Sequence, residues 1–155
     1  MKRILRVLLI TLVIFFIIIQ FIPNELPEGS FDETKDLLYL EQVPENIQAI
    51  LKTSCYDCHS NQTEYPWYSH VAPVSWLVIR DIREGRDEVN FSDWGNLKRR
   101  SKIKVLSNIA DEIKSGEMPL PIYLIIHRNA KLNDQQQEEL IEWTNQLIDQ
   151  IMEGE

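Results

Sequence analysis

The sequence predicts an all-α protein, because apolar residues recur at helical spacing in several segments and no group of short alternating runs could form a sheet. The one β-like run, residues 122–126, is isolated, and a single strand cannot build a sheet. Behind an apolar N-terminal segment, the 155 residues leave enough chain for one domain of ordinary size. We therefore expect helices to position any functional site.

Residues 1–22 combine a basic start with a long apolar run that Pro23 ends. The run approaches the ~20 residues of a membrane span and exceeds the ~7–15 residues of a typical signal-peptide core. We expect a signal anchor or transmembrane helix whose basic flank stays in the cytoplasm, so that the remaining chain faces the periplasm from the cytoplasmic membrane. A cleaved signal peptide is the alternative, because the run is short for a span.

Residues 23–42 mix prolines, Gly29 and acidic residues, and we expect them to form a tether. The apolar cluster at residues 37–40 could pack against the domain and shorten that tether. Residues 43–155 form the expected domain. Its first helix should begin at Pro44, a favourable first-turn residue, and lead into the first cysteine of the chain.

Three further helices are expected in the domain. One should run over residues 74–84 and end at Gly85, and another over residues 97–115 and end at Gly116. The last helix has the clearest signal, a capping box followed by an apolar stripe on one face: Asn133, Gln136, Leu140, Ile141, Thr144, Leu147, Ile148 and Ile151.

The net charge of the chain limits the classes of partner that it can bind. It carries 16 basic and 24 acidic residues, and three of the basic ones lie in the N-terminal segment, so the remainder has a net charge of 13 minus 24, or −11. Such a charge disfavours nucleic acid and anionic lipid as partners of this part of the chain and suits a basic or neutral partner, with an association that weakens as salt rises. The same charge could also serve solubility alone.

The most informative motif is Cys55-Tyr56-Asp57-Cys58-His59, which contains both cysteines of the chain. C-x-x-C-H is the spacing at which two thiols bond to the vinyl groups of a c-type haem while the histidine binds the iron. A structural zinc site would need four ligands, and no second cysteine pair or spaced histidine pair follows. A redox-active dithiol normally follows a strand, whereas a helical segment leads into this pair. It remains the alternative.

The sixth iron ligand would decide between electron transfer and ligand chemistry. Met118 lies directly after a helix stop and before two prolines, in a stiff loop that could hold a thioether against iron. His127 is the alternative distal ligand, although a histidine bonded to backbone or solvent explains it equally simply. His70 lies too close to the motif to reach the distal face, and Met152 lies near the chain end.

Together these segments resemble a known family, the small bacterial haem-binding domain proteins, which are single-haem relatives of cytochrome c. Beside the C-x-x-C-H motif, four segments over roughly residues 43–148 carry the resemblance: Tyr65-Pro66-Trp67-Tyr68, Pro73-Val74-Ser75-Trp76, Asn90-Phe91-Ser92-Asp93-Trp94 and Met118-Pro119. The resemblance implies a cytochrome c-like helical fold around one covalently bound haem c. It implies Cys55 and Cys58 as attachment residues and His59 as the proximal iron ligand. Met118 as the distal ligand follows the Gly-x-Met-Pro segment of ordinary cytochromes c.

We therefore expect a membrane-anchored monohaem cytochrome c that passes single electrons between redox proteins of a respiratory chain and is not itself an enzyme. Alternatives are a haem-based sensor or peroxidase-like protein with an open sixth site, and a haem-bearing structural subunit of a respiratory complex. Four tryptophans are expected to bury the porphyrin: Trp67, Trp76, Trp94 and Trp143. Arginines could pair with its propionates, and the sequence does not choose among four candidates: Arg80, Arg83, Arg86 and Arg128.

Overall fold

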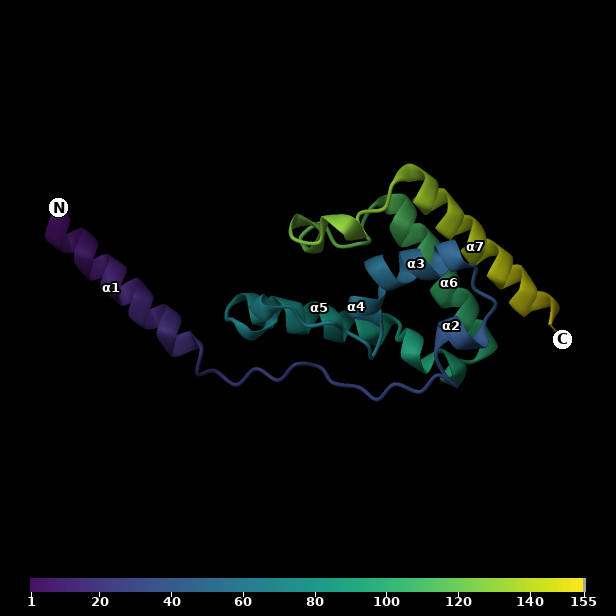
Figure 1. Cartoon of the computed structure of the whole chain (residues 1–155), viewed down its shortest axis with the longest axis horizontal. Helices are drawn as coiled ribbons and strands as arrows, with labels where there is room; N and C mark the ends of the chain where they lie inside the picture. The colour runs from purple at the N-terminus through teal and green to yellow at the C-terminus, as the bar shows by residue number, and fades with distance from the viewer. Residues whose placement is uncertain (155) are drawn as a thin grey trace.

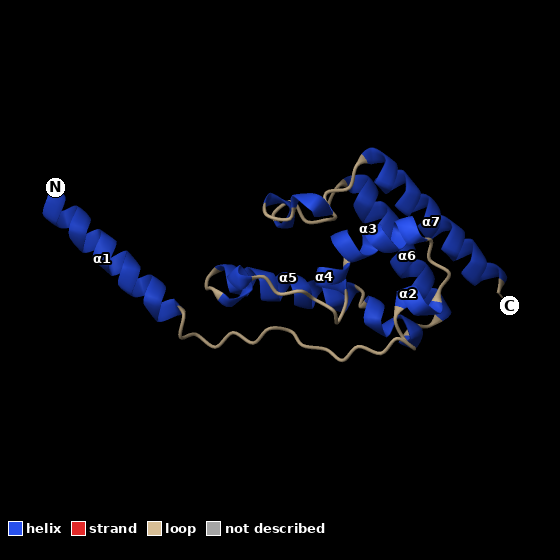
Figure 2. Cartoon of the chain, viewed as in Figure 1, coloured by secondary structure: helices blue, strands red, loops and turns tan. Residues whose placement is uncertain are grey.

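A computed structural model describes residues 1–154, and over these residues the protein is built from helices and loops (Figures 1 and 2). The described residues contain no β-strand, which confirms the all-α prediction. The β-like run at residues 122–126 forms a short 3-10 helix, η3 (Tyr123–Ile125). Glu155, the last residue of the expected domain, lies outside the described residues.

Helix α1 (Lys2–Ile19) projects away from the other helices, and its apolar side chains are exposed along most of its length (Figure 1). Along the described chain, we find no helix with both the length and the apolar character that crossing a membrane requires. The expected transmembrane helix is therefore not supported. The C-terminal end of α1 does contact the domain, because the side-chain amide of Gln20 exchanges two 3.0 Å hydrogen bonds with the backbone of Ala72.

The segment that follows α1 runs alongside α5 (Val74–Glu88) before it enters the domain (Figure 1). Four side chains of the domain donate to its backbone carbonyls: Arg83 to Glu25, Tyr65 to Pro27, Arg86 to Glu28 and Asn61 to Ser30. Asp36 and Leu37 are then fully buried at the start of α2 (Leu37–Leu40). Leu37 and Leu38 of the apolar cluster at residues 37–40 thus contribute to the core, whereas Tyr39 and Leu40 are exposed.

The core is formed mainly by α3 (Glu45–Ser54), α6 (Arg99–Ser115) and α7 (Asp134–Glu153), with α6 and α7 packed side by side. Gly116 ends α6 with φ at 75°, and a capping box opens α7, as the sequence predicts. The buried side chains come from all three helices and their neighbours: Ile47, Ile50, Leu51, Leu106, Ile113, Leu140, Trp143 and Leu147.

Gly85 does not end its helix, because α5 continues to Glu88. The glycine is buried where α5 crosses α4 (Tyr56–His59), and a Cβ atom at this position would lie 2.9 Å from the backbone oxygen of Cys58. The prediction of a helix stop was therefore wrong. A glycine here serves close approach between two helices, which sequence alone cannot distinguish from a C-terminal cap.

Candidate functional site

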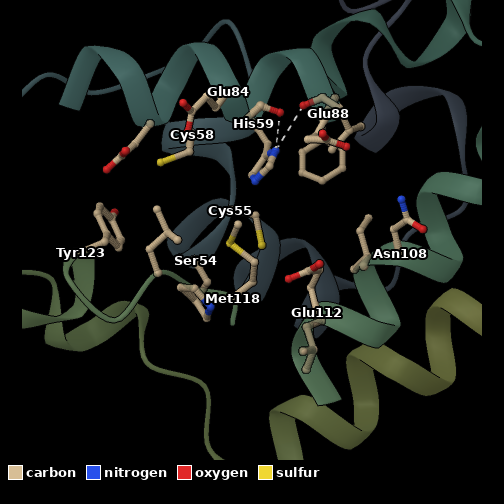
Figure 3. Close-up of a pocket in the computed structure, with 18 of the residues that line it drawn as sticks. Ser54, Cys55, Cys58, His59, Glu84, Glu88, Asn108, Glu112, Met118 and Tyr123 are labelled. Carbon is tan, nitrogen blue, oxygen red and sulfur yellow. Dashed lines mark hydrogen bonds between the residues drawn. The ribbon is translucent and has the colours of Figure 1, made fainter. Parts of the chain in front are cut away.

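A cavity of about 620 Å³ opens between two parts of the domain (Figure 3). We call Cys55 with α4 and α5 the attachment wall, and residues 105–115 of α6 with residues 116–130 the Met118 wall. Cys55, Cys58 and His59 line the first, and Met118 lines the second. The volume lies within the range of about 300–1,000 Å³ typical of small-molecule sites. The structure thus brings together four predicted site residues from both ends of the domain.

The C-x-x-C-H motif occupies the single helical turn of α4. The amides of Cys58 and His59 both donate to the carbonyl of Cys55, at 3.1 and 2.9 Å. Because residues three and four apart share one face of a helix, this turn presents the two thiols and the imidazole to the cavity. Tyr56 points away, with its buried ring stacked on Phe91 at 5.3 Å between centroids.

A buried carboxylate holds the outer side of this turn. Asp36 is fully buried and accepts hydrogen bonds from the Tyr56 hydroxyl at 2.9 Å, the Ser92 hydroxyl at 3.3 Å and the Leu38 amide at 2.9 Å. Burial, with the nearby Asp36 carboxylate, raises the pKa of Tyr56, so its hydroxyl remains a donor. No pattern in the sequence distinguishes Asp36, because it lies in a segment rich in acidic residues.

His59 is oriented by the backbone of α5. Its Nδ1 atom lies 2.8 Å from the carbonyl oxygen of Gly85 and 3.2 Å from that of Val89. Since carbonyls only accept, the proton belongs on Nδ1, and Nε2 keeps a free lone pair. Burial lowers the pKa of His59, against the opposing effect of these carbonyls. The imidazole is therefore neutral and preoriented as a metal ligand, and it points into the cavity (Figure 3).

Both cysteines are free, and burial raises the pKa of Cys55 to about 12 and that of Cys58 to about 11. Both are therefore protonated thiols at neutral pH. A redox-active dithiol instead needs an attacking cysteine with a lowered pKa. The electrostatics of this site thus disfavour the dithiol alternative.

The Met118 wall begins where α6 ends. The amides of Glu117 and Met118 both donate to the carbonyl of Glu112, which turns the chain at Gly116 and directs Met118 toward the cavity. Met118 and His59 come from opposite sides of the open space (Figure 3). Four apolar side chains of α6 and the following loop complete this wall: Val105, Ile109, Ile113 and Leu120. The α6 stripe that the sequence indicates as core therefore also borders the cavity.

The remaining ligand candidates lie elsewhere. His127 is absent from the cavity lining among the described residues; its ring stacks on Tyr123, with centroids 4.1 Å apart, and its Nε2 atom is hydrogen bonded to the Tyr68 hydroxyl. His70 and Met152 are exposed. Tyr123 itself lines the cavity, although no motif or spacing in the sequence marks it as a site residue.

The expectation that tryptophans surround the cavity was wrong, since the lining from residues 1–154 includes none of them. Trp94 and Trp143 lie in the helical core, whereas Trp67 is 77% exposed and Trp76 37% exposed. Trp94 is held there because its indole N–H donates to Glu41 at 2.6 Å and the Lys102 ammonium lies over its ring. Aliphatic side chains with Phe91 and Tyr123 line the cavity in their place.

Charged groups at the cavity are mostly acidic. Of the four arginines expected to pair with propionates, Arg80 lines the cavity, and its guanidinium binds Asp81 at 2.8 Å. Arg83 and Arg86 instead donate to the segment before α2. Four carboxylates accompany Arg80 at the lining: Asp81, Glu84, Glu88 and Glu112.

The donor set fits a haem. Two thiols three residues apart can bond to vinyl groups, the Nε2 atom of His59 can bind iron, and the Met118 thioether lies across the cavity. The rest of the lining combines apolar side chains with the charged groups named above, and the cavity has a suitable volume for a porphyrin.

Comparison with known proteins points the same way. Residues 14–146 match the family model of the haem-binding domain, a stretch that contains every residue lining the cavity. No curated protein and no solved structure matches the chain. Because the match covers most of the sequence, this protein belongs to the haem-binding domain family and binds haem.

Proposed function

We propose that the protein is a monohaem c-type cytochrome that passes single electrons between redox proteins. The observation that carries the proposal is the placement of Cys55, Cys58, His59 and Met118 on the walls of one cavity. This is the ligand set of an electron-transfer cytochrome, with histidine and methionine on opposite sides of the iron. A haem bound there supplies an iron that changes its oxidation state by one electron.

Each residue then has a separate role. Cys55 and Cys58 form the thioether bonds, and His59 binds iron through Nε2. The hydrogen bonds from Nδ1 to the carbonyls of Gly85 and Val89 fix the ring and increase the basicity of Nε2. Met118 would provide the second protein ligand to the iron, and the apolar side chains of the lining would limit access of water to it.

The partner is a protein with a basic or neutral contact surface. The carboxylates at the cavity lining and the net charge of −11 outside the N-terminal segment support this choice. Contacts between redox proteins are small and transient, so we expect the association to weaken steeply as salt rises. Components of a respiratory chain are the partners of this chemistry that we propose.

We also propose that α1 anchors the protein to the cytoplasmic membrane with the haem domain on the periplasmic side. Exposed apolar side chains cover α1, and a continuous apolar surface of this kind marks a contact with membrane or protein. Its three basic residues at the N-terminal end suit an anionic membrane surface. Membrane fractionation of the full chain, with and without a carbonate wash, tests the anchor.

The central test uses the full chain produced with haem. We expect a pyridine haemochrome spectrum of a haem with two thioether bonds and the weak red band of a thioether bound to ferric iron. Met118→Ala should remove that band, lower the reduction potential and open the ferrous iron to carbon monoxide. Met152→Ala, at an exposed methionine, is the control and should change none of these. A native protein that binds carbon monoxide as readily as Met118→Ala would contradict the electron-transfer proposal and favour a sensor or peroxidase-like protein.

A further inference from the structure

The loop that follows Met118 closes one side of the cavity with little apolar packing of its own. Residues 119–130 carry η3 and η4 (Arg128–Ala130), and η3 contains no buried residue. Ile125 is 69% exposed and Ile126 is 62% exposed. A segment with so few buried contacts opens easily unless specific bonds hold it.

One such bond joins the loop directly to the C-x-x-C-H motif. The hydroxyl of Tyr123 donates to Oδ2 of Asp57 at 2.9 Å, and Asp57 lies between the two cysteines. The other oxygen of Asp57 accepts from the amide of Glu64 at 3.1 Å, which fixes the carboxylate. The two walls of the cavity are therefore joined by a hydrogen bond to a charged acceptor, which is stronger than one between neutral groups.

A second hydrogen bond holds the loop through His127, whose ring stacks on that of Tyr123. The His127 ring lies nearly parallel to that of Tyr123, with an interplanar angle of 5° and centroids 4.1 Å apart. Its Nε2 atom is hydrogen bonded to the hydroxyl of Tyr68, which belongs to η1 (Trp67–His70) next to α5. His127 thus lies outside the cavity and connects the loop to η1, which packs against α5 of the attachment wall.

We propose that Tyr123, His127 and Tyr68 are positioning residues that hold the Met118 loop across the distal side of the haem and so limit access of external ligands to the iron. This inference rests on the proposed function, because it assumes that Met118 faces iron. It assigns a role to His127 other than ligation. Tyr123 is the central member, since it makes the bond to Asp57 and stacks on His127.

The test removes one hydroxyl at a time. Tyr123→Phe keeps the stacked ring and loses the bond to Asp57, and Tyr68→Phe loses the bond to His127. The matched control is Tyr65→Phe, which also loses one hydrogen bond, to the carbonyl of Pro27, but away from the loop. All three are made in the full, haem-loaded chain.

We expect Tyr123→Phe to bind carbon monoxide about 10-fold faster than the native protein, since losing a hydrogen bond to a charged group shifts an open–closed equilibrium by about that factor. The red band of the ferric protein should weaken in parallel. Tyr68→Phe should show the same change to a smaller extent, and Tyr65→Phe should match the native protein. Equal carbon monoxide rates in Tyr123→Phe and Tyr65→Phe would overturn the inference.

Amide hydrogen exchange tests this inference independently of the proposed function. The amides of Leu124 and His127 are bonded within the loop, and they should exchange about 10-fold faster in Tyr123→Phe than in Tyr65→Phe. This measurement does not depend on Met118 binding iron. If the native protein binds carbon monoxide freely, the proposed function fails while faster exchange still supports the loop contact. Unchanged exchange overturns the positioning role in either case.

Discussion

The two walls of the cavity are held in different ways. The attachment wall is continuous with the core, where Tyr56 is bonded to the buried Asp36 and His59 is bonded to the backbone of α5. The Met118 wall ends in an exposed loop joined to the rest by a few bonds from Tyr123 and His127. The difference indicates that the position of His59 is fixed by folding, whereas the position of Met118 depends on local contacts that can open separately.

The largest expected effect is a loss of stability when the buried carboxylate behind the attachment wall is removed. Asp36→Ala leaves the buried hydroxyls of Tyr56 and Ser92 without their acceptor, and we expect a loss of about 3 kcal/mol in the free energy of unfolding. Urea unfolding of the haem-loaded chain, followed by circular dichroism, measures it. Asp32→Ala is the control, because Asp32 is a partly exposed acid before α2 that binds only its neighbours Thr34 and Lys35 in the described structure. Equal losses in the two variants would contradict the assigned role of Asp36.

The second-largest expected effect is slow alkylation of the two cysteine thiols in the haem-free protein. Cys58 has the lower pKa of the two cysteines and therefore the larger thiolate fraction. Its pKa of about 11 lies two units above the ordinary 9.0. Below pH 9 its thiolate fraction should therefore be about 100-fold smaller than that of an ordinary cysteine, and alkylation should be slower by a similar factor. The rate should rise with pH up to about 11. Rates equal to those of the urea-unfolded chain would show that the attachment wall is open without haem.

Alanine substitutions at two glycines, one in each wall, allow a direct comparison of the walls. Gly85→Ala places a methyl group 2.9 Å from the backbone oxygen of Cys58, so helix α5 or α4 must shift, at a cost of about 2 kcal/mol. Gly116→Ala meets no atom within 4 Å and incurs only the cost of φ at 75°, about 1 kcal/mol. Thermal unfolding gives both values. Only Gly85→Ala should also disturb the haem spectrum, because Gly85 provides a carbonyl to His59.

The sequence could predict those parts of the site that depend on local spacing. The C-x-x-C-H turn, the Gly116 stop and the α7 capping box each follow from a few neighbouring residues, and the structure contains all three. The predicted helix stop at Gly85 was wrong, because this glycine allows close approach to Cys58, which is a tertiary contact. The same reason explains the absence of Asp36 and Tyr123 from the predicted site. Both act through partners 20 or more residues away, Tyr56 and Asp57, and no periodicity records such a contact.

The tryptophan prediction failed for a related reason. Aromatic residues near a cofactor motif are easily assigned to the cofactor, yet their burial depends on which face of each helix meets the core. Trp94 is fully buried in the core beside Glu41 and Lys102, while Trp67 lies on the surface. The cavity lining instead follows the apolar stripe of α6, where Val105, Ile109 and Ile113 border the cavity and also pack with the core.

The smallest expected effect tests whether the Met118 wall is held by polar contacts or by packing. Ile126→Ala shortens a side chain that is 62% exposed, and surface substitutions of this kind change the free energy of unfolding by about 0.5 kcal/mol or less. If the bonds of Tyr123 and His127 hold the loop, the rate of carbon monoxide binding should also stay at the native value. A rate as fast as that of Tyr123→Phe would mean that apolar contacts of the loop hold Met118 in place. The difference between the two walls would then be one of degree, since both would depend on packing.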